Sequence, residues 1–227
     1  LVAIAPLFTE SLKRLGIIRL RRLSFIGRDT TDYLDVVMAK GYEADCIPIL
    51  ASHIAQQSSL FEVIHLIDIP DRSCNHALLY EELSRQGFAG DHFANEYCPR
   101  TKLQCTWEAT IASLPSSKRS SLKRVQRKID SDFKVELQAV TNPDQLPNDF
   151  TEFINLHQKR WNGSGHLGVF ADARTTSFHR EISEIALERK WLFLAFLLLD
   201  GRRIAANYGF TYRKYLYYYQ GVAHSII

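Results

Sequence analysis

A hairpin signal near the end of the chain constrains the fold more than any other feature of the sequence. Asp200-Gly201 separates a nine-residue apolar run, residues 191–199, from a second strand-like segment, residues 203–212. This dipeptide between two strand-like segments is typical of a tight turn between paired strands. A third strand-like segment, residues 214–222, follows directly. We therefore expect three consecutive strands joined by hairpins at this end of the chain.

The segments before this hairpin contain both strands and helices. Strands are predicted over residues 1–8, 17–26, 33–39, 61–69 and 133–140, and residues 93–103 are expected to be extended. Apolar periodicity and end signals predict helices over residues 43–57, 73–86, 106–114, 116–132, 149–162 and 173–190. From residue 133 the order is strand, helix, helix, strand, strand, strand. The pattern predicts an α/β (α+β) fold.

The composition is that of a folded chain. Apolar residues make up 46% of its 227 residues, so the chain has enough apolar side chains to bury a core. A helix that crosses a bilayer needs about 20 apolar residues, and the longest apolar run here has nine. We therefore expect no membrane span. The net charge of +3 is too balanced to indicate nucleic acid by itself, and no DNA partner is predicted.

The cysteines and most histidines lack the spacing of a metal site. The chain has four cysteines without a C-x-x-C pair, namely Cys46, Cys74, Cys98 and Cys105. The histidines of the first half are scattered in the same way, so we predict no bound metal. Buried, reduced thiols are the expectation for the cysteines, and they favour a cytoplasmic location.

Both ends of the sequence resemble interrupted strands. The chain opens at Leu1 inside an apolar run, and it stops at Ile227 directly after a strand-like segment. We therefore expect it to be a fragment of a longer protein.

Short motifs across the chain are similar to those of one known family. In the second half they read LHQKRW from Leu156, GVFADAR from Gly168, FHR from Phe178 and LDGRRIAA from Leu199. Upstream, DYLD from Asp32 and LPSSKRSSL from Leu114 also match. These motifs resemble the acetyltransferase-6 family of bacterial GNAT acyltransferases, which is associated with cellulose and exopolysaccharide synthesis. The element order from residue 133 is also the opening half of the GNAT topology.

The resemblance implies an architecture and a donor. It implies tandem GNAT-like domains with mixed central sheets flanked by helices, related to the Fem-type aminoacyltransferases. We place the first domain at residues 1–132 and the second, incomplete domain at residues 133–227. The family uses acyl-CoA as co-substrate, and its donor loop would fall beyond Ile227. The chain by itself is therefore expected to be inactive.

The predicted helix 116–132 is strongly basic. Residues 116–134 contain seven basic and two acidic side chains, a net charge of +5. Helical geometry predicts that Leu122, Val125 and Ile129 share one buried face. A charge run of this kind is commonly a solvated helix face, and it also suits a phosphate group on a donor or an acceptor. Because the family motif includes Lys118 and Arg119, we assign these two to substrate binding.

The helix over residues 149–162 carries the candidate catalytic base. His157 shares a face with Phe153 and Trp161, so it is directed inward. A hydrogen-bonded core histidine is one interpretation. The other is a general base, because an imidazole accepts a proton near neutral pH. We assign His157 as catalytic, Arg160 as a ligand for carboxylate or phosphate, and Trp161 as a wall of the substrate site.

The last strands supply three further candidates. Asn207 faces the opposite way from Tyr208 and is suited to a hydrogen bond with a substrate amide. Tyrosines crowd the same strands, where aromatic residues are favoured in any case. One of them is a candidate acid for the leaving thiolate. We include Tyr208 and Tyr218 among the substrate-binding residues.

The function expected from these residues is acyl transfer. The acyl group, an acetyl group in the simplest case, would pass from acyl-CoA to an amine or hydroxyl of a sugar or cell-envelope precursor. The acceptor would be a small molecule or carrier-linked. Two alternatives stay open, a Fem-like transferase that uses aminoacyl-tRNA and a non-catalytic binding module.

Overall fold

The chain forms two compact units in the computed structural model, which describes residues 1–14, 18–28 and 30–223. The units are Leu1–Lys102 and Leu103–Ile227. Helix 116–132 is therefore grouped with the second unit, whereas the sequence analysis assigns it to the first domain. The tandem domains and their boundary stay a prediction. Residue 17, with which one predicted strand begins, and Ile227 lie outside the described residues.

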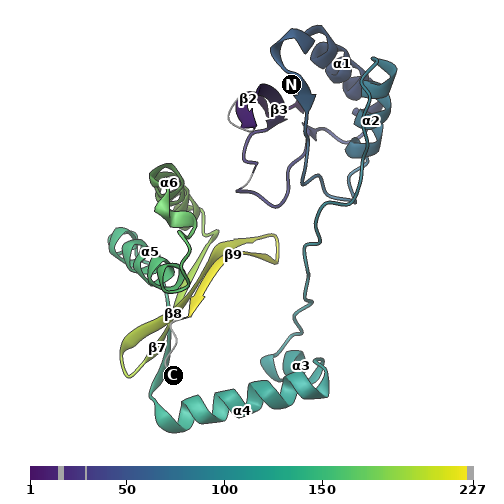
Figure 1. Cartoon of the computed structure of the whole chain (residues 1–227). Coiled ribbons are helices and arrows are strands. Elements are labelled where there is room, and N and C mark those ends of the chain that lie inside the picture. Colours follow the sequence, from purple (N-terminus) through teal and green to yellow (C-terminus); the bar gives the residue numbers. More distant parts are fainter. Residues whose placement is uncertain (15–17, 29, 224–227) are drawn as a thin grey trace. The chain divides into compact units, whose positions relative to one another are not determined.

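The first unit contains two small sheets and two main helices (Figure 1). Its strands are β1 (Ala3–Ile4), β2 (Leu7–Arg14), β3 (Ile18–Phe25), β4 (Val37–Met38) and β5 (Val63–Ile64). Its helices are α1 (Glu43–Gln56), the 3-10 turn η1 (Ser58–Leu60) and α2 (Asn75–Arg85). Strand β3 pairs antiparallel with β2 and parallel with β5, so this sheet is mixed, as predicted. Its core forms where apolar faces of α1 and α2 meet, around Ile47, Ala51 and Leu79.

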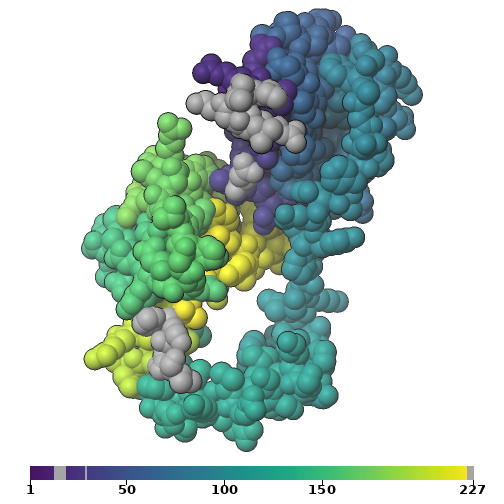
Figure 2. All heavy atoms as spheres, in the orientation of Figure 1, coloured from purple at the N-terminus to yellow at the C-terminus, as the bar shows by residue number. Residues whose placement is uncertain are grey.

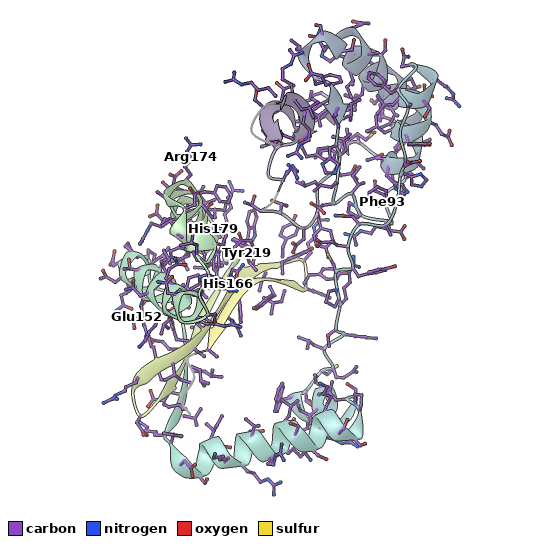
Figure 3. All side chains as sticks on the ribbon, in the orientation of Figure 1. Phe93, Glu152, His166, Arg174, His179 and Tyr219 are labelled. Atoms are coloured by element: carbon purple, nitrogen blue, oxygen red, sulfur yellow. The ribbon has the colours of Figure 1, made fainter. Side chains whose placement is uncertain are left out.

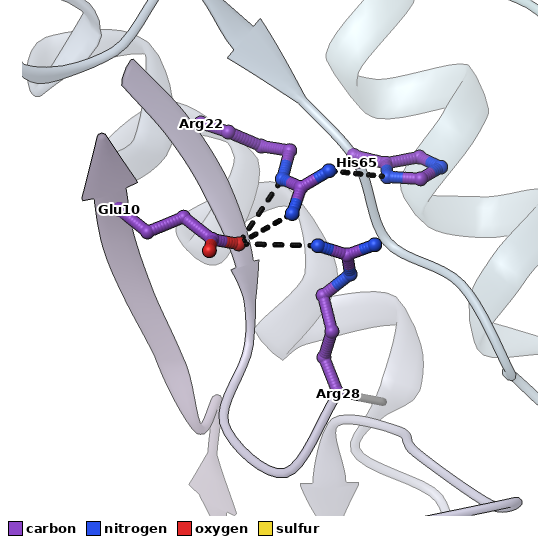
Figure 4. Close-up of polar contacts among 4 residues, drawn as sticks. All are labelled: Glu10, Arg22, Arg28 and His65. Atoms are coloured by element: carbon purple, nitrogen blue, oxygen red, sulfur yellow. Dashed lines mark hydrogen bonds and ion pairs between the residues drawn. The ribbon is translucent and has the colours of Figure 1, made fainter. Parts of the chain in front are cut away.

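A polar cluster joins the β2–β3 hairpin to the segment after β5 (Figure 4). Glu10 Oε1 accepts hydrogen bonds from Arg22 Nη2 at 2.7 Å and from Arg28 Nη1 at 3.3 Å. Arg22 Nη1 lies 3.5 Å from Nδ1 of His65. The carboxylate holds two guanidinium groups close together, so this cluster fixes how the strands of the first unit meet.

The second unit is one antiparallel sheet, with two helices before its first strand and two more, with a 3-10 turn, between its first and second strands. Its helices are α3 (Trp107–Ala112), α4 (Ser116–Asp132), α5 (Leu146–Gly163), the 3-10 turn η2 (Val169–Ala171) and α6 (Ala173–Glu188). Its strands are β6 (Val135–Ala139), β7 (Leu192–Leu199), β8 (Arg202–Tyr212) and β9 (Tyr215–Ala223), paired in that order. The predicted strand and helix order from residue 133 is confirmed, and Asp200 and Gly201 both have positive φ in the hairpin turn.

Helices α5 and α6 cover one face of this sheet (Figure 1). Side chains alternate between faces along a strand, so every second residue of β7 and β8 meets the helices. The buried core contains Phe150, Phe153, Phe170, Leu194, Phe196, Ala206, Tyr208 and Val222. Arg203 ties β8 to the start of α5, because its Nη2 donates to Asp149 Oδ1 at 2.7 Å. On the opposite face Leu137 is 80% exposed.

Helix α4 differs from its prediction. Its bounds agree with the predicted helix 116–132, but none of its residues is buried. Leu122 is 44% and Val125 50% exposed, and Figure 2 draws α4 among the teal atoms at the lower edge of the view. The expected buried face is therefore wrong. The 3.6-residue period shows which side chains share a face, but not whether another element covers that face.

Three other expectations change. The cysteines carry no disulfide, but Cys74, Cys98 and Cys105 are exposed and Cys46 is half-buried, so the expected burial is wrong.

Residues 93–103 pair with no strand. Strand β2 extends beyond residue 8 to Arg14, because backbone pairing with β3 holds a segment with few apolar residues. In the described ranges, no helix has the length and apolar character that crossing a membrane requires.

The core predicts a sharp contrast between two substitutions in the second unit. Phe153 is fully buried, so Phe153→Ala should lower the free energy of unfolding by about 3–5 kcal/mol. The control Leu137→Ala, on the exposed face, should change it by about 1 kcal/mol or less. Urea denaturation measures both, and equal losses would contradict the assignment of the two faces.

Candidate active site

His157 lies in the core of the second unit, on α5. Its side chain is fully buried. Helical spacing places it one turn after Phe153 and one turn before Trp161, so all three share the face that meets the sheet. Its Nε2 lies 3.3 Å from Gln220 Oε1 on β9. The sequence-based expectation that His157 is directed inward is confirmed, and the strand that it meets is β9.

Three side chains bond to the ring of His157 and fix its tautomer. Trp161 Nε1 donates to His157 Nε2 at 2.9 Å. An indole N–H is only a donor, so Nε2 must carry the lone pair and Nδ1 the proton. Nδ1 can then donate to Gln158 Oε1, 3.2 Å away. Amide oxygen and nitrogen are interchangeable assignments, and the compatible orientation of Gln220 presents its NH₂ to Nε2. The ring is therefore neutral.

Burial favours this neutral form. Desolvation lowers the pKa of His157 below its usual value, and the positive charge of Arg160 lowers it slightly further. Oxygen atoms of Gln158 and of Gln220, in its other amide orientation, would accept hydrogen bonds from the charged ring, which acts in the other direction and raises the pKa. The net effect is a lowered pKa, so His157 is available as a proton acceptor at neutral pH.

The loop after α5 closes over this histidine. Gly168 has a φ of +24°, and a Cβ built on it would lie 2.5 Å from Gln158 Oε1 and 3.1 Å from His157 Cε1. A side chain at this position would displace the loop. The ring of Phe170, two residues on, meets that of His157 edge-on at 4.9 Å. The loop between α5 and η2 thus packs against His157.

A second buried histidine was missed by the sequence analysis. His179 on α6 lies between two tyrosines (Figure 3): its Nδ1 is 3.1 Å from the Tyr208 hydroxyl and its Nε2 2.9 Å from that of Tyr219. Burial lowers the pKa of His179 to about 4. Burial and, to a smaller degree, Tyr219 raise the pKa of Tyr208. The signal was present in the family motif FHR, which includes His179.

The two histidines contact consecutive residues of one strand. Tyr208 pairs with Gln220 and Gly209 pairs with Tyr218, so Tyr219 is the extra residue of a β-bulge in β9. Tyr219 bonds to His179 and Gln220 bonds to His157. Both side chains therefore face the helices, although strict alternation would send one of them to the other face.

The predicted substrate residues of the sheet fall on opposite faces. Tyr208 is fully buried beneath α5 and α6. Asn207 and Tyr218 are exposed on the far face, where both lie against Gly221: a Cβ there would be 2.5 Å from the Tyr218 hydroxyl and 2.7 Å from Asn207 Oδ1. Arg160 Nη1 donates to the carbonyl of the same Gly221 at 3.0 Å. Gly221 thus lies close to three predicted site residues, Asn207, Tyr218 and Arg160.

The predicted residues of α4 have different environments. Lys118 is exposed, whereas Arg119 is half-buried and donates from Nη1 to the carbonyl of Ala112 in α3 at 3.0 Å. A shallow hollow runs along the helix between serine and arginine side chains, lined by Ser117, Ser120, Ser121, Arg124 and Arg127. Hydroxyl and guanidinium groups of this kind suit an anionic ligand.

The part of the chain that the structure describes contains no group of three or more His, Cys, Asp or Glu residues that could hold a metal ion. The described residues of the candidate site offer a neutral imidazole, exposed amide and phenol groups and nearby cations.

Comparison with known families gives one match. Residues 116–226 match the family model described as Acetyltransferase (GNAT) domain. The matched segment runs from α4 to β9 and contains His157, and the mixed α/β architecture with helices against its sheets is consistent with a GNAT-like fold. The match supports a general acyltransferase function, and GNAT domains use acetyl-CoA. Comparisons with curated proteins and with solved structures found no match.

His179 predicts a loss of stability in acid. Its pKa is about 4 when folded and about 6.5 when unfolded. Between these values the unfolded chain binds the proton more readily, so the free energy of unfolding should fall as pH drops through this window, by up to about 3 kcal/mol. His179→Gln should lower the free energy of unfolding at pH 7.5, and this free energy should then depend less on pH.

Urea denaturation at pH 7.5 and 5 measures the effect. His53→Gln, an exposed histidine in the first unit, serves as the control and should leave the dependence unchanged. An unaltered slope in His179→Gln would contradict the assignment of a neutral, buried imidazole.

Proposed function

We propose that the protein transfers an acyl group, in the simplest case an acetyl group, from acyl-CoA to an amine or hydroxyl. The observation that supports this most directly is the GNAT match over a segment whose core holds a neutral histidine with a lone pair on Nε2. We infer from the family resemblance that the acceptor is a sugar or cell-envelope precursor, free or carrier-linked, and that the reaction takes place in the cytoplasm.

In this proposal His157 is the general base. Its Nε2 removes the proton from the acceptor as the acceptor nitrogen or oxygen attacks the thioester carbonyl. The carbon–sulfur bond breaks, a carbon–nitrogen or carbon–oxygen bond forms, and the thiolate leaves and takes up a proton. Of the two predicted tyrosines, Tyr208 is buried and Tyr218 is exposed on the face of the sheet opposite His157, so the proposal takes that proton from solvent.

Substrate binding is assigned to the cations and to the exposed face of the sheet. Asn207 offers an amide next to Tyr218. Arg160 and Trp161 follow His157 on α5, and the Arg160 guanidinium carbon is 5.8 Å from the indole ring centre. Lys118 and Arg119 are assigned to a phosphate group of the donor or acceptor.

His157→Gln tests the base directly. Glutamine retains a hydrogen-bonding amide but cannot take the proton, so turnover of the full-length protein should fall by roughly 10²–10⁴-fold while the melting temperature stays near that of the wild type. The assay follows release of the free thiol from acetyl-CoA with a panel of amines and sugars. His53→Gln is the matched control. A lower melting temperature with unchanged turnover per folded molecule would assign His157 to the core only.

The basic helix allows a comparison of three cations. Lys118→Ala and Arg119→Ala should each weaken binding of acetyl-CoA, which carries phosphate groups, as measured by isothermal titration. Arg124→Ala should have little effect beyond a few tenths of a kcal/mol on stability. Equal losses in all three variants would indicate diffuse attraction and no defined site. A larger loss in Arg124→Ala would place the phosphate in the hollow that Arg124 lines and contradict the assignment to Lys118 and Arg119.

A Fem-like transferase is the second candidate, because α4 exposes a dense row of cations that suits an RNA backbone. Titration with acetyl-CoA and with aminoacyl-tRNA separates the two donors. A protein that binds both substrates of a reaction but transfers nothing would instead be a binding module.

A further inference from the structure

Trp161 covers Nε2 of His157, the nitrogen that would act as the base. We propose that Trp161 is a positioning residue, which holds His157 in the tautomer with a lone pair on Nε2 and covers that lone pair until an acceptor takes its place. This inference rests on the proposed function in treating His157 as the base, but the hydrogen bond and its consequences are measurable without any substrate.

The first step is the nature of the donor. Trp161 Nε1 lies 2.9 Å from Nε2 of His157, within the ordinary range for a hydrogen bond. The indole has no acceptor atom, so the bond exists only while Nε2 is unprotonated. Protonation of Nε2 would place two N–H groups against each other. Trp161 therefore selects the neutral ring with the tautomer that a base requires.

The second step is the position of Trp161 between His157 and the solvent. His157 is fully buried, whereas Trp161 is half-buried and lies at the end of α5 next to exposed groups. The exposed His166 ring meets the indole edge-on at 6.1 Å, and Arg160 lies over it. On another side Phe170 and the Gly168 loop seal the imidazole. The indole is thus a half-buried cover of Nε2, beside the half-buried Gln220.

The third step is chemical. A buried nitrogen that loses its hydrogen-bond partner is destabilised. The N–H of an amine or the O–H of a sugar is a donor like the indole N–H, so an acceptor can replace Trp161 without leaving Nε2 unsatisfied. A ligand group without a hydrogen to donate cannot. The exchange therefore favours the nucleophiles from which His157 has a proton to remove.

The Trp161→Phe variant tests this inference, because it keeps an aromatic ring and removes the N–H. Loss of a hydrogen bond to the neutral ring should raise the pKa of His157. Uncovering Nε2 should also speed its modification by diethyl pyrocarbonate at least about tenfold, as mass spectrometry of the His157 peptide would show. Histidine C2–H exchange against pH reports the pKa. Trp191→Phe, at the start of β7, is the control and should change neither value.

Two histidines of the same sample calibrate the measurement. The exposed His166 reports reagent activity, and His179, bonded to two tyrosines, reports global opening. Faster modification of His157 alone supports the inference, and an unchanged rate and pKa overturn it. If Trp161→Phe fails to fold, the ¹⁵N shifts of the wild-type His157 ring decide, since a proton on Nε2 overturns the inference.

Activity separates this inference from the proposed function. In Trp161→Phe the acid limb of kcat/KM against pH should move to higher pH with the pKa of His157, whereas a purely structural tryptophan would leave the limb in place. If His157 is uncovered as expected but no variant and no wild-type sample transfers an acyl group, the covering role stands and the proposed function fails.

Discussion

Two buried imidazoles hold the second unit together. His157 on α5 and His179 on α6 reach the same strand and bond to its consecutive residues Gln220 and Tyr219. Both rings stay neutral because burial lowers their pKa values. The ring of Phe170 lies edge-on to each of them. The two helices, the loop between them and strand β9 therefore depend on one small group of rings, and the candidate base belongs to that group.

Much of the second unit was predictable from its sequence. Apolar runs and the Asp200-Gly201 turn predicted β7 and β8, and helical spacing placed His157 inward, because local chain geometry determines these features. The partners of His157 were not predictable in the same way. Gln220 belongs to β9, which is distant from α5 in the sequence, and the bulge at Tyr219 brings the side chains of Tyr219 and Gln220 to the helix face. Hydrophobic alternation reveals neither long-range pairing nor a one-residue shift. His179 was overlooked for the same reason, since its tyrosine partners are distant in sequence.

Helix α4 shows that the bounds of a helix can be predicted when its burial cannot. Its bounds follow from Pro115 and from the helix-forming residues after it, and they were predicted correctly. Whether Leu122 and Val125 are covered depends on which other elements pack against them, and a periodic pattern carries no information about that. The same holds for Lys118 and Arg119, whose neighbours differ although they are adjacent in the chain. The roles of these residues, the acceptor and a donor loop beyond Ile227 stay predictions.

The bulge gives β9 one residue that its backbone pairing with β8 does not need. On its carboxyl side, Val222 and Gln220 face the helices. On its amino side the odd-numbered residues share a face, and the rings of Tyr215 and Tyr217 are 6.2 Å apart. Deleting Tyr219 would restore simple alternation, with Tyr218 still opposite Gly209 on the far face and Gln220 still opposite Tyr208. The strand would keep both of its faces and lose only the hydroxyl that bonds to His179 Nε2, so the residue that the sheet can spare is the one that holds the imidazole.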